Sequence, residues 1–193
     1  MSGIPKKVQR TSNNFLEDNT INNYNSTRQS VGRRSKSGRL DVDEGIVRAK
    51  AENLVEKMIE ARSMDEGIVK GELTGIPTHC IKILREIQES FNYGPVREFL
   101  LQSTNFLARI RNLLEPLPLK NNLPSYAIQR DLVTLLNNID WKRKEEEVIQ
   151  RLEQSRLGGI ISFMADNHKQ VSKDVKEICE GLIKTWTGVL TGK

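Results

Sequence analysis

Apolar residues recur at three- and four-residue intervals from about residue 41 to about residue 190. This spacing places them on one face of an α-helix, and the sequence has no run of alternating apolar and polar residues of the kind that forms a half-buried strand. We therefore predict an all-α fold in which about 150 residues form seven or eight short helices around one core.

Capping residues and prolines divide this region into separate helices. Asp41 or Asp43 can cap the first helix, and Thr78 precedes the second. Pro116 and Pro118 end a helix, because proline lacks a backbone donor and restricts the residue before it. The predicted helices cover about residues 41–64, 79–91, 96–101, 103–114, 125–136, 142–154, 160–164 and 171–189, with breaks at 67–77 and a turn at 155–159.

Residues 1–40 have a different composition from the rest of the chain. They are rich in Asn, Ser, Thr, Gly and Arg, and they carry eight basic and two acidic residues, a net charge of +6. Their few apolar residues show no period, so they cannot bury enough surface to offset the entropy lost on ordering. We predict a basic disordered tail over residues 1–40 and a helical domain over residues 41–193.

The tail contains a cluster of basic residues at Arg33, Arg34, Lys36 and Arg39. Such a cluster is typical of a contact with nucleic acid or of a nuclear import signal, and DNA and histones are both candidate partners. A solvated basic linker has the same composition, and both interpretations stay open.

Other features indicate the compartment. No stretch approaches the roughly 20 apolar residues of a membrane span, and the first ten residues lack the apolar region of a signal peptide. We therefore expect an intracellular protein that does not bind membranes. In a reducing compartment Cys80 and Cys179 are expected to be buried thiols rather than a disulfide.

Residues that could carry catalysis are scarce. His79 and His168 lack metal-ligand spacing to each other or to a second ligand set. The pair Gly158-Gly159 lacks the strand, the further glycine and the lysine of a phosphate-binding loop. Acidic residues 145–147 follow basic residues 142–144, which is typical of an exposed helix face. We predict a non-catalytic protein that uses no metal and no cofactor.

Three segments in a fixed order resemble a known family. Residues 110–118 read IRNLLEPLP and are followed by Leu123-Pro124 and the apolar positions of residues 128–136. Residues 152–164 read LEQSRLGGIISFM, and residues 182–186 read LIKTW. Together these segments resemble the TFIIS N-terminal-like helical domain, and more narrowly the Iws/Spn family of transcription elongation factors. The resemblance covers about residues 42–190.

This resemblance implies a right-handed bundle of short helices in an armadillo- or HEAT-like arrangement. It implies a nuclear adaptor that binds an extended segment of an Spt-family histone chaperone and associates with RNA polymerase II on chromatin. It also implies a monomer that forms a heterodimer with this chaperone. Two alternatives stay open: a nucleic-acid- or histone-binding protein that acts through its tail, and a TFIIS- or Mediator-like factor with a different partner.

The resemblance also implies a peptide-binding site. Phe163 would supply the aromatic contact beside Ile160, although a Phe at this position also fits an ordinary core. Gly159 stands where the family usually has Arg or Lys, and Arg156 is a nearby base that could replace it. The candidate partner-binding residues are Arg111, Leu132, Leu136, Arg156, Gly159, Ile160, Phe163 and Met164.

Overall fold

The computed structural model describes residues 43–103, 105–167 and 169–192. Within these ranges the chain is all-helical and contains no strand, so the predicted fold class is confirmed. The predicted tail, with Arg33, Arg34, Lys36 and Arg39, and its boundary with the helical domain lie outside the described residues. The elements are α1 (Glu44–Lys70), α2 (His79–Asn92), α3 (Gly94–Ser103), α4 (Phe106–Leu114), α5 (Tyr126–Asn137), the short 3-10 helix η1 (Trp141–Arg143), α6 (Glu146–Ser155), α7 (Leu157–Asp166) and α8 (Lys173–Leu190).

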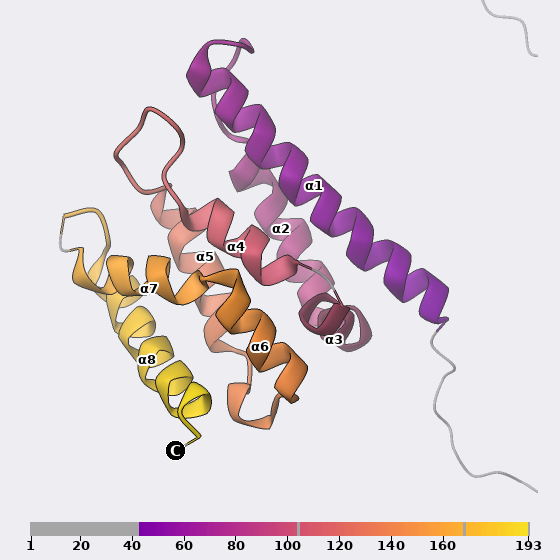
Figure 1. Ribbon diagram of the computed structural model, residues 1–193. Coiled ribbons are helices and arrows are strands. Elements are labelled where there is room, and N and C mark those ends of the chain that lie inside the picture. The colour runs from indigo at the N-terminus through magenta and orange to yellow at the C-terminus, as the bar shows by residue number, and fades with distance from the viewer. Residues whose placement is uncertain (1–42, 104, 168, 193) are drawn as a thin grey trace, which may run out of the picture. The chain divides into compact units, whose positions relative to one another are not determined.

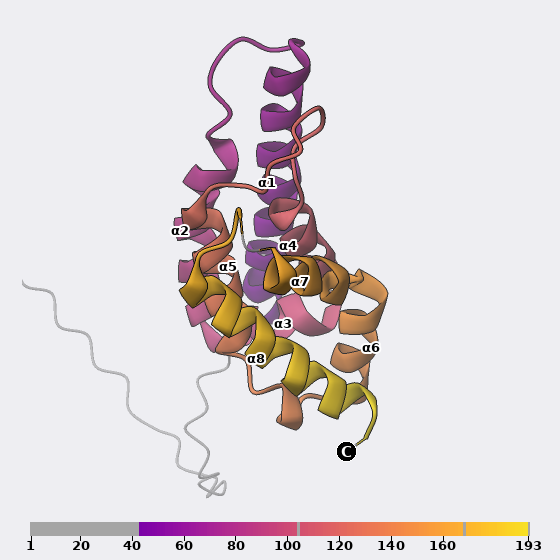
Figure 2. The ribbon, with the colours of Figure 1, turned by 90° about the vertical axis from the view of Figure 1, so that its left-hand side faces the viewer.

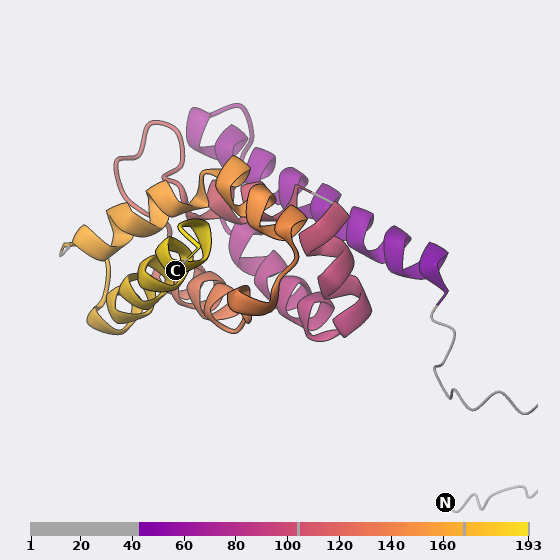
Figure 3. The same ribbon diagram turned by 60° about the horizontal axis from the view of Figure 1, so that its bottom comes forward.

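The helices of the described domain pack in neighbouring pairs around α4. Helix α1 lies along one side, where it contacts α2 and α3, and α8 lies on the other side against α5 and α7 (Figures 1 and 3). Helix α4 runs between these groups and contacts α1, α5, α6 and α7. Figure 2 shows α7 and α8 on the side nearest the viewer, with α8 below α7.

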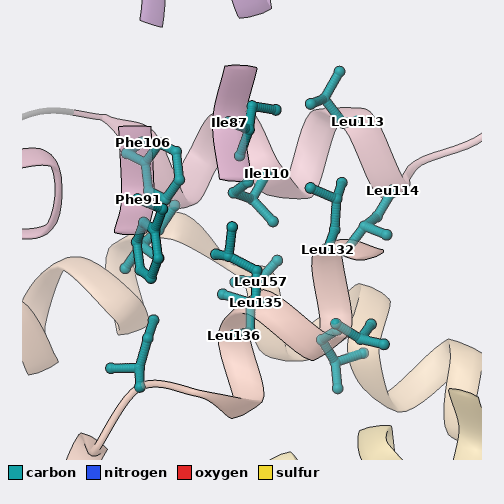
Figure 4. Packing of buried hydrophobic residues seen from close by; sticks show 14 of the residues in the cluster. Ile87, Phe91, Phe106, Ile110, Leu113, Leu114, Leu132, Leu135, Leu136 and Leu157 are labelled. Carbon is teal, nitrogen blue, oxygen red and sulfur yellow. The ribbon is translucent and has the colours of Figure 1, made fainter. Parts of the chain in front are cut away.

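One apolar core extends through all of these helices. Its centre is α4, whose Phe106, Ile110 and Leu114 are fully buried. Figure 4 shows these side chains among leucines from α5 and the first residue of α7. The rings of Phe91 and Phe106 stack with their centroids 5.7 Å apart, which ties α2 to α4.

Helix α1 is longer than predicted. Its start agrees with the capping pattern, because the side chain of Asp43 accepts a hydrogen bond of 2.9 Å from the amide of Gly45. The predicted end at Met64 is wrong, because the helix continues through Gly67 to Lys70. It ends at Gly71, which has a φ of 80°, a left-handed conformation that favours glycine.

Two later boundaries also differ from prediction. Residues 141–143 form η1 rather than the start of a helix, because Trp141 is buried and its indole Nε1 donates to the carbonyl of Leu136 at 3.0 Å. The Trp141 ring also packs edge-on against Trp186, with centroids 5.5 Å apart. The predicted turn over residues 155–159 contracts to Arg156, and α7 begins at Leu157.

Both cysteines are buried free thiols, as predicted. Burial is the main cause that raises the pKa of Cys80 and of Cys179 to about 12, so neither is a thiolate near neutral pH. In the described ranges no group of three His, Cys, Asp or Glu side chains could hold a metal ion. None of the described helices is long and apolar enough to cross a membrane.

Candidate partner-binding surface

The candidate partner-binding surface depends on the junction between α6 and α7. Arg156 has a φ of 55°, so the chain turns sharply at one residue and the two helices follow each other directly. The hydroxyl of Ser155 donates to the carbonyl of Leu152 at 2.6 Å and accepts from the amide of Leu157 at 3.1 Å. Ser155 is itself buried, so its hydroxyl satisfies backbone groups that water cannot reach.

Arg111 connects α4 to this junction. Its Nη1 donates to the carbonyl of Ser155 at 3.2 Å, at the C-terminal end of α6, where a cation stabilises the helix dipole. Its Nε lies 3.1 Å from the carboxylate of Glu115, and its Nη2 donates to the side chain of Asn112. Arg111 thus holds the start of α7 in place.

The exposed face of α7 follows from its helical spacing. Gly159 and Phe163 are four residues apart and therefore lie on the same face, and Phe163 is 51% exposed. Ile160 is partly buried and packs against the edge of the core. A Cβ atom at Gly159 would meet no atom within 4 Å, so the space above the helix backbone beside Phe163 is open. The core interpretation of Phe163 does not fit this exposure.

Three of the predicted contact residues lie in the core instead. Leu132 and Leu136 of α5 are buried, and Figure 4 places them among the apolar side chains of α4 and α5. Met164 of α7 is also fully buried. Their side chains hold the helices together beneath the surface and have no face to offer a partner in this structure.

The other five predicted residues fall along one surface. Arg111 and Arg156 lie at the α6–α7 junction, and Gly159, Ile160 and Phe163 follow along α7. Arg156 is exposed and carries its positive charge one turn before Ile160. The surface therefore joins a basic end to an apolar ridge, an arrangement that can bind an extended segment with apolar and acidic side chains.

Ser155 was not predicted to contribute to this region. A serine at the end of an amphipathic helix is usually exposed, and the sequence has no signal that this one lies beneath the junction and accepts the amide of Leu157. The positive φ of Arg156, the one residue that separates α6 from α7, is also visible only in the structure.

The chain is similar in sequence to two curated proteins. No protein-family model matches the chain. Two curated relatives are both described as transcription factor iws1. The protein from Aspergillus fumigatus is 28% identical over 79% of this chain, and the one from Emericella nidulans is 29% identical over 80%. The matched region is 31% of each relative, so the chain spans about a third of their length.

A solved structure has the same fold. It is described as a Spt6-Iws1(Spn1) complex from Encephalitozoon cuniculi, and the match has a TM-score of 0.60 and 24% identity over 77% of this chain and 97% of that chain. The likeness to this structure shows the fold of the described helices, and the two curated relatives are described as transcription factors. The three ordered segments of the sequence resemble the same Iws/Spn family.

Proposed function

We propose that this protein is a non-catalytic transcription elongation adaptor that acts in the nucleus. In this proposal the surface formed by Arg111, Arg156, Gly159, Ile160 and Phe163 binds an extended segment of an Spt-family histone chaperone and connects it to RNA polymerase II on chromatin. The protein is a monomer by itself and forms a heterodimer with the chaperone.

The exposure of Phe163 is the observation that carries this proposal. Aromatic residues are enriched among the few side chains that supply most of the binding energy of an interface. The open space above Gly159 lets the main chain of a partner approach α7 beside the ring. The solved structural neighbour is itself a complex of Spt6 with Iws1(Spn1), which favours this class of partner.

The charges of the surface favour a partner with acidic side chains. Arg156 is exposed and makes no ion pair among the described residues, so it is available to a carboxylate. Arg111 already contacts Ser155 and Glu115, and its role is mainly to position the junction. Leu132, Leu136 and Met164 contribute by packing beneath the surface.

The test is Phe163→Asp in the full chain. Loss of an aromatic anchor should weaken binding of a purified N-terminal chaperone segment by roughly 30-fold or more, about 2 kcal/mol, in isothermal titration calorimetry. Helical circular dichroism and the unfolding midpoint should stay near wild type. The matched control is Ile81→Asp, which removes an apolar side chain of similar exposure, 41%, from α2.

Three results would contradict the proposal. Unchanged affinity in Phe163→Asp would remove α7 from the interface. Loss of helical signal in the same variant would show that the ring supports the core. Capture of other transcription factors from nuclear extract, without the chaperone, would assign the domain to a TFIIS- or Mediator-like factor.

A second candidate function depends on the basic tail. Its net charge of +6 favours binding to DNA or to another polyanion through Arg33, Arg34, Lys36 and Arg39. Such binding should weaken steeply between about 50 and 200 mM salt and disappear when residues 1–40 are deleted. Binding at the α7 surface should survive the deletion and depend less on salt. A fluorescently tagged full chain, followed by microscopy, tests the nuclear location.

A further inference from the structure

The exposed face of α7 continues beyond Phe163 to the end of the helix. The exposed residues of α7 have the spacing i, i+3, i+4 and i+7 of a single helix face, and they are Gly159, Ser162, Phe163 and Asp166. The side chains of Leu157, Ile161 and Met164 are buried on the other side and hold the helix against the core. Asp166 therefore belongs to the same surface as Gly159 and Phe163.

Asp166 gives the C-terminal end of this face a negative charge. It is the last residue of α7 and lies one turn beyond Phe163. Its carboxylate is exposed and makes no hydrogen bond or ion pair with any described residue, Lys169 of the following loop included. An anion at the C-terminal end of a helix opposes the helix dipole, so this carboxylate does not stabilise α7. It is free to contact a cation of a partner.

Arg156 gives the N-terminal end of α7 the opposite charge. It precedes the first residue of the helix, and its exposed guanidinium has no ion-pair partner within the described part of the chain. Arg156 and Asp166 are ten positions apart, so a rise of about 1.5 Å per residue separates their backbone positions by about 15 Å along the helix. The surface thus has a free cation at one end and a free anion at the other.

The space between the two charges suits a large apolar side chain. The ring of Phe163 is 51% exposed, and the exposed residues beside it, Gly159 and Ser162, are both small. A Cβ atom at Gly159 would meet no atom within 4 Å. A partner side chain can therefore pack against the ring while the partner main chain passes close to Gly159, and an aromatic ring offers a large apolar contact area.

We infer that the partner segment lies along α7 in one direction, with an acidic side chain at Arg156, a large apolar side chain against Phe163 and a Lys or Arg at Asp166. An extended chain rises about 3.3 Å per residue, so about 15 Å places the acidic and the basic residue about four or five positions apart. A segment bound in reverse would bring like charges together at both ends. This inference rests on the proposed function of the α7 surface, to which it adds the basic residue and the spacing.

The test is Asp166→Lys in the full chain, measured by isothermal titration calorimetry with the same purified N-terminal chaperone segment as Phe163→Asp. Repulsion in place of attraction at an exposed pair should weaken binding about three- to tenfold, and Asp166→Asn should weaken it less. The loss in Asp166→Lys should shrink between about 50 and 500 mM salt, whereas the loss in Phe163→Asp should change little. A lysine at this helix end favours the helix dipole, so the unfolding midpoint should not fall.

The matched control is Glu60→Lys. Glu60 is an exposed acid of α1 without an ion pair among the described residues, so this variant makes the same change in net charge and should keep wild-type affinity. Charge exchange then identifies the partner residues. One Lys or Arg of the segment, replaced by Glu, should restore affinity for Asp166→Lys. An Asp or Glu about four or five positions away, replaced by Lys, should restore affinity for Arg156→Glu.

The outcomes separate this inference from the proposed function. Loss of binding in Phe163→Asp but not in Asp166→Lys would overturn the inference alone, because the segment would then bind α7 without a basic residue at Asp166. Unchanged affinity in Phe163→Asp would overturn both. Tighter binding in Asp166→Lys would place an acidic partner residue at this end, and an equal loss in Glu60→Lys would reduce the effect to net charge. Either result would also overturn the inference.

Discussion

Replacing Asp65 with alanine would remove a buried carboxylate that caps α2 from the neighbouring helix. Asp65 belongs to α1 and is 2% exposed. Its Oδ1 accepts from the amide of His79 at 2.9 Å, and its Oδ2 accepts from the amide of Cys80 at 2.9 Å. Thr78, at the N-cap position of α2, makes no capping hydrogen bond with its own side chain. The first turn of α2 is therefore capped by α1.

The structure sets the size of the expected effect. Loss of an N-cap costs about 1 kcal/mol. A buried donor left without a partner costs a further 1 to 3 kcal/mol or so. The amide of Cys80 is buried. His79 is partly exposed, so water can replace part of its hydrogen bonding with Asp65. We therefore expect Asp65→Ala to lower the free energy of unfolding by about 2 to 4 kcal/mol.

The assay is urea unfolding of the full chain, followed by circular dichroism. Glu60→Ala is the matched control, because Glu60 is an exposed carboxylate of α1 that makes no side-chain hydrogen bond or ion pair with the described residues. Equal free energies of unfolding for the two variants, within about 0.5 kcal/mol, would refute the reasoning, since surface substitutions stay in that range. In Asp65→Ala the first amides of α2 should lose protection before those of α8. Hydrogen exchange measures this local effect.

The remaining predictions concern pH, thiol reactivity and helix propensity. Burial acts to raise the pKa of Asp65, but hydrogen bonds from Cys80 and His79 outweigh it and lower that pKa. The stability from this carboxylate is therefore complete above about pH 3.9 and is lost as the pH falls through the lower folded pKa. Urea unfolding between pH 5 and 2 should show a steeper loss for wild type than for Asp65→Asn, and equal slopes would contradict this. At pH 8 a thiol reagent should modify Cys80 and Cys179 far more slowly in the native protein than in urea, because burial raises both pKa values to about 12, whereas equal rates would contradict burial. Gly159→Ala should raise the free energy of unfolding by about 0.5 to 1 kcal/mol, because alanine favours a helix and its Cβ meets open space, and a destabilised variant would contradict the open space above α7.

Most of the helices could be predicted from local features of the sequence. Apolar spacing located α2, α4, α5 and α8, since these helices each bury one face. Pro116 and Pro118 correctly placed the end of α4 at Leu114. These signals act within one or two helical turns, so a single sequence contains them.

Boundaries set by contacts between distant residues could not be predicted in this way. Gly67 and Gly71 have equal potential as helix-ending residues in the sequence, and only Gly71 adopts a positive φ. Leu73 folds back to within 3.0 Å of where a Cβ of Gly67 would lie, so the loop packs against the helix there. The cap from Asp65 to α2 joins residues 14 apart or more, beyond any local pattern.

The candidate partner-binding residues could be narrowed to a segment but not to individual side chains. Leu157, Ile160, Ile161, Phe163 and Met164 make α7 apolar on nearly every face. Periodicity gives no single buried stripe for such a helix, which is why Met164 was included among the predicted contacts and Phe163 could equally be core. The direction in which α7 faces depends on Arg156, Ser155 and the packing against α8.

An exposed phenylalanine is not by itself a sign of a binding site, because single apolar residues are common on protein surfaces. The argument for α7 comes from the residues beside Phe163. Ile160 extends the apolar surface toward Arg156, and Gly159 leaves the backbone uncovered one turn before the ring. A helix that needed only to fold would be more stable with alanine at this position, since glycine costs up to about 1 kcal/mol in a helix. Gly159 therefore lowers the stability of α7 at a position where the backbone beside Phe163 is open to a partner.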